Sequence, residues 1–183
     1  MSTNTEIPIK EQEKNKKSHN FVNYIINRCE SSNGVRAALK RADNPATEYQ
    51  SWELLASFQI NLEYENQRLP YATIAAAIAR MEPNRNGNVK IGQAIARCYE
   101  DGNASNQAKA KLRRLLACES VTEVCRILRP LLSLIDARGG LTLNYAQLLD
   151  ELLWFGHDDS QLRIKASWAQ DFYGNSATGG EDE

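Results

Sequence analysis

The sequence predicts an all-α protein, a compact bundle of about seven to eight helices. Two observations carry this fold class. Apolar residues between residues 18 and 174 recur at spacings of three and four, which is the period of a helix. No segment alternates polar and apolar residues over a useful strand length, and no internal repeat is present. The length of 183 residues suits one domain, or two small helical subdomains with a break near residues 82–104.

Two helices are expected at the start of the folded region. Ser18 can cap the first helix, whose apolar stripe includes Phe21 and Ile25. The Asn33-Gly34 pair ends that helix. The segment "VRAALKRA" then forms a short second helix.

Two further helices are expected before residue 82. Asn44 followed by Pro45 combines a cap with a first-turn proline and opens the first of them. One side of this helix carries Tyr49, Trp52, Leu55 and Ala56. After Pro70, the alanine-rich segment "YATIAAAIARM" strongly favours a helix. Residues 82–88, "EPNRNGN", are the clearest loop in the chain.

The middle of the chain alternates helices with short loops. "VKIGQAIARCY" predicts a helix and "EDGNASN" a loop, after which Ser105 or Asn106 can cap the next helix. Ser120 and Glu123 have the spacing of a capping box, so another helix is expected to begin at about residue 121. Pro130 should kink that helix or end it early.

Two helices are expected to close the domain. Gly139 and Gly140 form a turn before the segment "LNYAQLLDELLWF". The last helix, in "DSQLRIKASWAQDFYG", opens after Asp158 or Asp159 and ends at Gly174.

The two ends of the chain differ in composition from the rest. Residues 1–17 and 175–183 are polar and are expected to be disordered, so residues 18–174 form the predicted domain. The N-terminal tail lacks the apolar core of a secretory signal, and no run approaches the ~18 apolar residues of a membrane span.

The cysteines favour an intracellular protein. They are scattered without C-x-x-C spacing, which speaks against a metal site or a disulfide framework. We expect all of them to be free and buried in the reducing cytoplasm of a cell. They are Cys29, Cys98, Cys118 and Cys125.

Charge is distributed unevenly along a chain whose formal net charge is -1. Residues 80–138 hold eleven basic and six acidic side chains, whereas residues 145–183 hold two basic and eight acidic ones. The basic excess is sharpest in residues 106–132, where only Glu119 and Glu123 are acidic. The basic residues of this stretch are Lys109, Lys111, Arg113, Arg114, Arg126 and Arg129.

Helical periodicity predicts that these bases surround the exposed faces of two consecutive helices. Leucines and small residues form the inner stripe of each helix, and the bases fall outside both stripes. Like charges three or four residues apart repel, so a partner anion is expected. One interpretation is an external polyanion contacted through its phosphates. The other is pairing with an acidic partner or with the chain's own acidic C-terminal helices.

No enzyme, metal site or cofactor is predicted. The two histidines, His19 and His157, lie beside the polar tail and in a turn. The sequence contains no P-loop, no G-x-S-x-G and no G-x-G-x-x-G. The adjacent residues of "HDD" point in different directions, and no second cluster of ligands exists to complete a metal site. Asp150 and Glu151 are expected on the solvated side of their helix.

The order of several segments resembles the CasB family, the small subunit of the type I-E CRISPR Cascade surveillance complex. The resemblance spans about residues 20–174 and depends on order and spacing more than on any single motif. Its segments are "GVRAALKRA", "VKIGQAIAR", "KLRRLLACESVTEVCRILRPLLSLI", "LNYAQLLDELLWF" and "SWAQDFYG".

The resemblance implies a non-catalytic, wholly helical subunit in the cytoplasm of a prokaryote. Such a subunit takes part in antiviral defence and is present as a pair of copies docked on the repeated backbone subunits of Cascade. Its expected partners are therefore a second copy of itself, other Cascade subunits, crRNA and target DNA. It would help to hold the crRNA–target heteroduplex and the displaced strand of the R-loop, while base pairing reads the sequence.

The resemblance also implies nucleic-acid-binding positions. The basic site at the end of the short N-terminal helix falls on Lys40 and Arg41, and the one on the loop before the alanine-rich helix falls on Arg68. The base ahead of the leucine pair at 115 and 116 is Lys111, and the one in the L-R-x-L-L stretch is Arg129. The helical-face argument, not the family pattern, adds Arg36, Arg114 and Arg126.

Overall fold

The computed structural model describes the backbone of residues 9–138 and 140–174, and the side chains from residue 16 onward in those ranges. Every regular element in this part of the chain is a helix, and one isolated parallel β-bridge joins Val89 to Leu143. The prediction of an all-α fold is confirmed. The predicted tail positions 1–8 and 175–183 lie outside the described residues.

The described helices follow the predicted order, with two differences. A short 3₁₀-helix, Gly102–Ala104, lies in the segment expected as a loop, and one predicted helix is divided in two. The segment expected as a single helix after Asn44 consists of a 3₁₀-helix followed by a short α-helix. The elements are α1 (Ile9–Ser31), α2 (Asn33–Arg41), η1 (Pro45–Ser51), α3 (Trp52–Ser57), α4 (Glu65–Met81), α5 (Ile91–Arg97), η2 (Gly102–Ala104), α6 (Asn106–Leu116), α7 (Val121–Arg138), α8 (Tyr145–Trp154) and α9 (Asp158–Tyr173).

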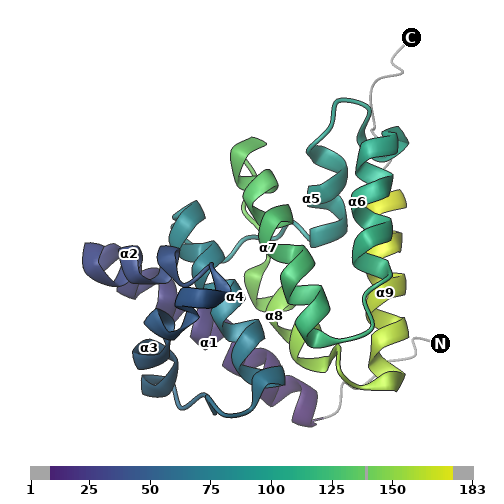
Figure 1. The fold of residues 1–183 in the computed structure, drawn as a ribbon. Helices are drawn as coiled ribbons and strands as arrows, with labels where there is room; N and C mark the ends of the chain where they lie inside the picture. Colours follow the sequence, from purple (N-terminus) through teal and green to yellow (C-terminus); the bar gives the residue numbers. More distant parts are fainter. Residues whose placement is uncertain (1–8, 139, 175–183) are drawn as a thin grey trace, which may run out of the picture.

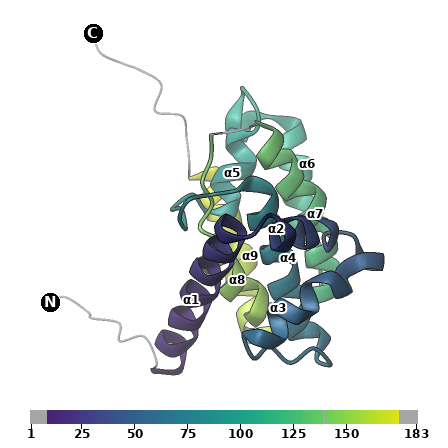
Figure 2. The same cartoon turned by 90° about the vertical axis from the view of Figure 1, so that its left-hand side faces the viewer.

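The helices form two groups joined by a shared middle. In Figure 1, α1 to α4 lie on one side, α5, α6 and α9 lie on the other, and α7 and α8 lie between them. The turned view in Figure 2 places α1 at the opposite side of the molecule from α6 and α7. Helix α4 packs against α7, α1, α2 and α8, so it is the central element of the larger group.

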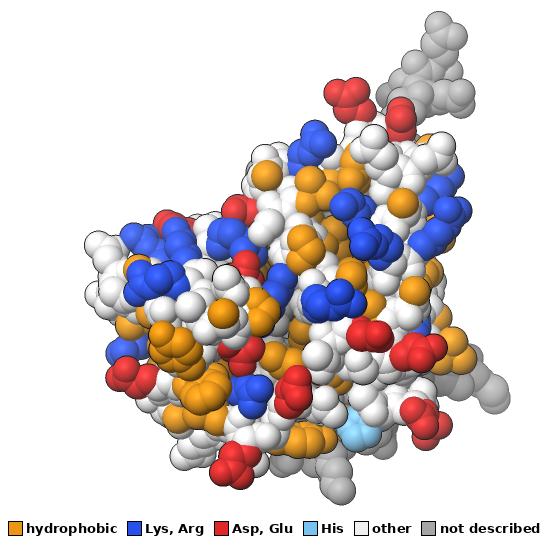
Figure 3. Space-filling model, in the orientation of Figure 1, with side chains coloured by type: hydrophobic (Ala, Val, Ile, Leu, Met, Phe, Trp, Pro, Cys, Tyr) orange, Lys and Arg blue, Asp and Glu red, His pale blue; other side chains and the backbone are white. Residues whose placement is uncertain are grey.

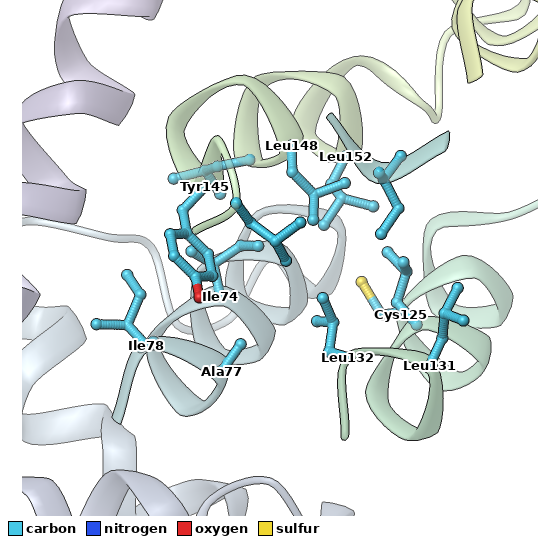
Figure 4. Packing of buried hydrophobic residues seen from close by; sticks show 14 of the residues in the cluster. Ile74, Ala77, Ile78, Cys125, Leu131, Leu132, Tyr145, Leu148 and Leu152 are labelled. Carbon is cyan, nitrogen blue, oxygen red and sulfur yellow. The ribbon is translucent and has the colours of Figure 1, made fainter. Parts of the chain in front are cut away.

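Helix α4 is central because its side chains allow close approach from all sides. Every residue from Leu69 to Ala79 is buried, and many of them are alanines. Figure 4 shows Ile74 and Ile78 of α4 in one packed cluster with Leu132 of α7 and Tyr145 of α8. Removal of apolar surface from water in such clusters is the main force that stabilises the fold.

Helix α1 begins earlier than the sequence indicates. It starts at Ile9, and Ser18 lies inside it, so the prediction that Ser18 caps the helix is wrong. The Ser18 side chain is buried and its hydroxyl donates to Asp150 Oδ1 of α8 at 2.5 Å. A serine can occupy a helix interior when its hydroxyl finds such a tertiary acceptor. The predicted stripe of Phe21 and Ile25 is fully buried, as expected.

The segment after Asn44 shows how a local change of helix type redirects side chains. The Asn44 side chain accepts from the backbone N–H of Ala46, so the predicted cap is confirmed. Leu55 is buried as predicted, but Tyr49 and Trp52 are 58% and 39% exposed. In a 3₁₀-helix, side chains three residues apart lie on the same face, so Tyr49 and Trp52 point the same way, and here that face is exposed.

Helix α7 continues through Pro130 without a break. The helix runs from Val121 to Arg138 with Pro130 inside it, so the predicted early end is wrong. Pro130 is exposed, whereas Leu128, Leu131 and Leu132 around it are buried. Burial of these neighbours offsets the hydrogen bond that proline cannot make.

Candidate nucleic-acid interface

Helix α6 presents the clearest basic face. Ser105 caps it by accepting from the Ala108 N–H at 3.2 Å, and Ala108, Leu112 and Leu115 form its buried stripe. The helical period predicts these three residues together with Leu116, which is only partly buried. The basic side chains lie outside the stripe: Lys109 and Lys111 are partly exposed, and Arg113 and Arg114 are exposed.

Among the residues that the structure describes, the bases of α6 and of the first turns of α7 form no ion pair. Within residues 16–138 and 140–174, no carboxylate lies within 4.0 Å of the charged nitrogens of the four α6 bases or of Arg126. Arg126 is exposed on α7, as predicted. These five side chains, hereafter the α6–α7 basic surface, are Lys109, Lys111, Arg113, Arg114 and Arg126.

A base on the last helix lies near this surface. Burial raises the pKa of the Cys118 thiol and the charge of Glu123 raises it further, while the charges of Lys165 and Arg126 oppose that rise. Both cations therefore lie within electrostatic reach of the same sulfur. Lys165 belongs to α9 and sits over the ring of Phe155 at 5.6 Å. Sequence reasoning missed Lys165 because residues 145–183 are acidic overall and nothing local marks one lysine among them.

Arg129 is the main correction to the predicted binding set. Only 8% of it is exposed, so the expectation that it lies on a solvent-exposed face is wrong. It donates to the backbone carbonyl of Asp43, and its Nη2 lies 3.4 Å from Glu48 Oε2. Arg129 follows Cys125 by four residues and precedes Leu132 by three, so it borders the buried stripe. This position within the helical period was the feature of the sequence that could have predicted the burial of Arg129.

Arg68 is also held inside the protein and is not on a loop. It lies in the first turn of α4, and its Nε donates to Glu48 Oε1 at 2.9 Å. A second guanidinium nitrogen donates to the Leu62 carbonyl, and the group sits 5.7 Å from the ring centre of Trp52. Arg68 and Arg129 therefore share the buried carboxylate of Glu48.

The predicted bases of α2 form a separate, partly exposed group. Arg36 Nη1 lies 2.9 Å from Glu82 Oε2, and Lys40 Nζ lies 2.6 Å from Glu82 Oε1. Arg41 donates from Nε to Gln50 Oε1 at 2.7 Å. Figure 3 shows Lys and Arg side chains gathered over α2 and, separately, over α6 and α7. The structure thus divides the predicted residues into two surface groups and one internal pair.

The acidic C-terminal helices do not neutralise the basic stretch of residues 106–132. In the part of the chain that the structure describes, the one base of this stretch in an ion pair is Arg129, and its partner is Glu48 of η1. Asp171 of α9 pairs instead with Lys90, at 3.0 Å. The expectation that these bases pair with the chain's own C-terminal acids is therefore wrong for the described residues.

Metal binding and membrane insertion find no support in the same ranges. No group of three or more histidine, cysteine, aspartate or glutamate side chains could hold a metal ion among the described residues. No described helix is long and apolar enough to cross a membrane. The four cysteines are free and buried, as predicted.

The fold is similar to those of three solved proteins named CasB or assigned to the Cse2 family. CasB from M. ruber has a TM-score of 0.67 and 23% sequence identity, covering 86% of this chain and 93% of that chain. CasB from Thermobifida fusca has a TM-score of 0.66 and 15% identity, covering 86% and 98%. A Cse2-family protein from Thermus thermophilus has a TM-score of 0.65 and 19% identity, covering 86% and 97%.

Sequence comparison gives the same assignment. No curated protein gives a significant match to the chain. The family model described as CRISPR-associated protein Cse2 matches residues 35–173, which is most of the chain and includes α4 to α9 in full. The chain belongs to the Cse2 family of CRISPR-associated proteins, also called CasB.

Proposed function

We propose that this chain is a non-catalytic small subunit of a type I-E Cascade complex and binds nucleic-acid backbone through its α6–α7 basic surface. Its partners would be crRNA, target DNA, the repeated backbone subunits and a second copy of itself. By holding the heteroduplex and the displaced strand, it would favour an R-loop whose formation is otherwise nearly balanced in free energy.

One observation carries the nucleic-acid part of the proposal. Five bases of the α6–α7 basic surface lack a carboxylate within ion-pair distance among the described residues, whereas Arg68 and Arg129 have one. Neighbouring unpaired cations repel one another, and phosphates placed between them would remove that repulsion. Arginine is well suited to this contact because its guanidinium binds two phosphate oxygens at once.

The composition of the α6–α7 basic surface favours contact with the nucleic-acid backbone over recognition of nucleobases. The exposed aromatic residues of the described chain lie on other elements: Tyr49, Trp52, Tyr64 and Tyr173. Helix α6 has no exposed aromatic residue for stacking, and its amide side chains, Asn106 and Gln107, lie in its first turn, away from Arg113 and Arg114. It therefore has little means to distinguish nucleobases. We therefore expect affinity that is independent of sequence and falls steeply with salt.

A fluorescence titration of the full chain tests this part of the proposal. The variant Lys111→Ala/Arg114→Ala/Arg126→Ala should bind labelled single- and double-stranded oligonucleotides at least about tenfold more weakly than the wild type. A matched control, Lys16→Ala/Lys17→Ala/Arg28→Ala, removes the same number of positive charges from exposed positions of α1, outside the α6–α7 basic surface. Equal weakening in both variants would mean that net charge alone matters and would overturn the proposed surface.

Assembly tests the subunit part of the proposal. The chain, co-expressed with crRNA and the other Cascade subunits, should co-purify with them in a complex that contains two copies of it. A complex that forms fully without it, and from which it is absent, would contradict the proposal. The second candidate, a helical module whose basic face binds an acidic protein, would be favoured if the chain joined the complex but the triple variant still supported R-loop formation.

A further inference from the structure

We propose that Arg36 and Lys40 form a phosphate-binding site that Glu82 occupies in the free protein, so that nucleic acid binds there only by displacing this carboxylate. The inference rests on the proposed function and identifies a device that limits binding at one of its surfaces. It concerns α2 and the end of α4, which lie apart from the α6–α7 basic surface in Figure 3.

The three side chains are arranged as a cation pair around one anion. Each carboxylate oxygen of Glu82 takes one cation: Oε2 accepts from Arg36 Nη1 at 2.9 Å, and Oε1 accepts from Lys40 Nζ at 2.6 Å. Asn33 Oδ1 accepts from the other terminal nitrogen of Arg36 at 2.6 Å and so orients the guanidinium. Two oxygens of one phosphate could replace the two carboxylate oxygens in the same contacts.

This arrangement is open to solvent. The side chains of Arg36, Lys40 and Glu82 are 31%, 43% and 46% exposed. A phosphate can therefore approach, and water can solvate the carboxylate after it leaves. Glu48 differs in this respect, since its side chain is only 9% exposed between Arg68 and Arg129. Displacing Glu48 would leave a buried charge without a partner, so that pair is not exchangeable.

The carboxylate of Glu82 is charged when it makes these contacts. The hydrogen bond from Lys40 lowers the pKa of Glu82, and the charge of Arg36 acts in the same direction. At neutral pH the carboxylate therefore carries the negative charge that competes with a phosphate. Exposed ion pairs are weak individually, so the competitor can be removed by a polyanion that offers many phosphates at once.

The backbone at Glu82 supports a role for its side chain. Glu82 has φ 49° and ψ 47° and is the C-cap of α4. Glycine or asparagine usually occupies this left-handed position because other residues are strained there. Glutamate contributes nothing to the turn that these residues would not contribute better, whereas its carboxylate reaches both cations of α2.

Neutralising Glu82 in the full chain tests the proposal. Glu82→Gln and Glu82→Asn should each tighten binding of a fluorescein-labelled oligonucleotide by about two- to tenfold at low salt. Asparagine tolerates the left-handed backbone, so the second variant keeps the fold even if glutamine disturbs the turn. Glu53→Gln is the matched control, since Glu53 is exposed, lies near α2, and has no ion pair within the described residues.

A second background separates displacement from a general gain in positive charge. In Arg36→Ala/Lys40→Ala protein, Glu82→Gln should no longer tighten binding, because the site that it would free is gone. A gain of equal size in that background, or with Glu53→Gln, would overturn the inference, as would unchanged affinity of both Glu82 variants. If wild-type binding depends on the α6–α7 basic surface but not on Glu82, this inference fails and the proposed function stands. Failure of every variant to bind would instead refute the proposed function.

Discussion

Arg129 Nη2 lies 3.4 Å from Glu48 Oε2 in the interior of the protein, where the two residues are 8% and 7% exposed. Glu48 also accepts from Arg68, so one carboxylate connects η1 to both α4 and α7. Two bases that the sequence suggests for nucleic acid thus help to hold helices together. The sequence predicts nucleic-acid binding for both Arg129 and Lys111, but only Arg129 is buried, and this difference has measurable consequences.

Replacing Arg129 should destabilise the fold. Arg129→Ala leaves Glu48 and the Asp43 carbonyl short of a donor, with a cost of about 2–3 kcal/mol in the free energy of unfolding. Urea denaturation followed by tryptophan fluorescence measures this loss. Lys111→Ala is the control and should change the free energy of unfolding by no more than about 0.5 kcal/mol. Equal stability of the two variants would contradict the internal role of Arg129.

Gly92 should be intolerant of any side chain. A Cβ at this position would lie 2.3 Å from the Trp168 carbonyl oxygen and 2.8 Å from the Phe172 nitrogen, both backbone atoms of α9. Gly92→Ala should therefore force α5 away from α9 and cost about 2 kcal/mol or more, measurable by thermal or urea unfolding. Gly34→Ala in helix α2 serves as the control, because the added Cβ would meet only the Ser32 hydroxyl, at 3.7 Å. That substitution should be neutral or stabilise by about 0.5–1 kcal/mol.

The thiols should be unreactive until the protein unfolds. Burial raises the pKa of all four cysteines, and it raises the pKa of Cys125 to about 12. Only the thiolate reacts with disulfide reagents, so the native protein should be modified slowly at mildly alkaline pH. Counting thiols with an aromatic disulfide reagent, with and without denaturant, checks this. Rapid titration of several thiols in the native state would contradict the buried arrangement.

Glu151 should give a recognisable pH dependence of stability. The expectation that Glu151 lies on the solvated side of its helix is wrong, because its carboxylate accepts hydrogen bonds from Trp168 and Gln147. Burial raises the pKa of Glu151 above the ordinary value of 4.5, although these hydrogen bonds lower it. A raised pKa in the folded state means that the folded protein binds more protons, so this contribution is fully present below pH 4.5 and is lost as the pH rises through the folded-state value. The free energy of unfolding of the wild type relative to Glu151→Gln should therefore decline from pH 4.5 toward neutral pH. An increase over that range would contradict the assignment.

Local periodicity predicts much of this fold. The stripe of Ala108, Leu112 and Leu115 follows from the helical period alone, and the structure buries all three residues. The Ser105 cap follows in the same way from residue type. Such features depend on neighbours within one or two turns, which is the range over which a single sequence carries information.

The incorrect predictions have long-range causes. Ser18 is not a cap because its hydroxyl meets Asp150, 132 positions away. Arg129 is buried because Glu48 and the carbonyl of Asp43, more than 80 positions earlier, accept its hydrogen bonds. No local motif marks Glu82, yet it forms ion pairs with two bases of α2. Charge counts give the net charge of each segment but do not show which acid pairs with which base. They could not distinguish basic side chains in ion pairs from those without one.

The salt dependence of binding tests the central claim most directly. For wild-type protein on duplex DNA, the logarithm of the binding constant should fall linearly with the logarithm of salt concentration. Because each lost phosphate contact lowers the slope by about 0.9, Lys111→Ala/Arg114→Ala/Arg126→Ala should reduce it by about two to three, and the α1 control should not. Identical slopes for the wild type and this variant would contradict the claim that the α6–α7 basic surface contacts phosphates.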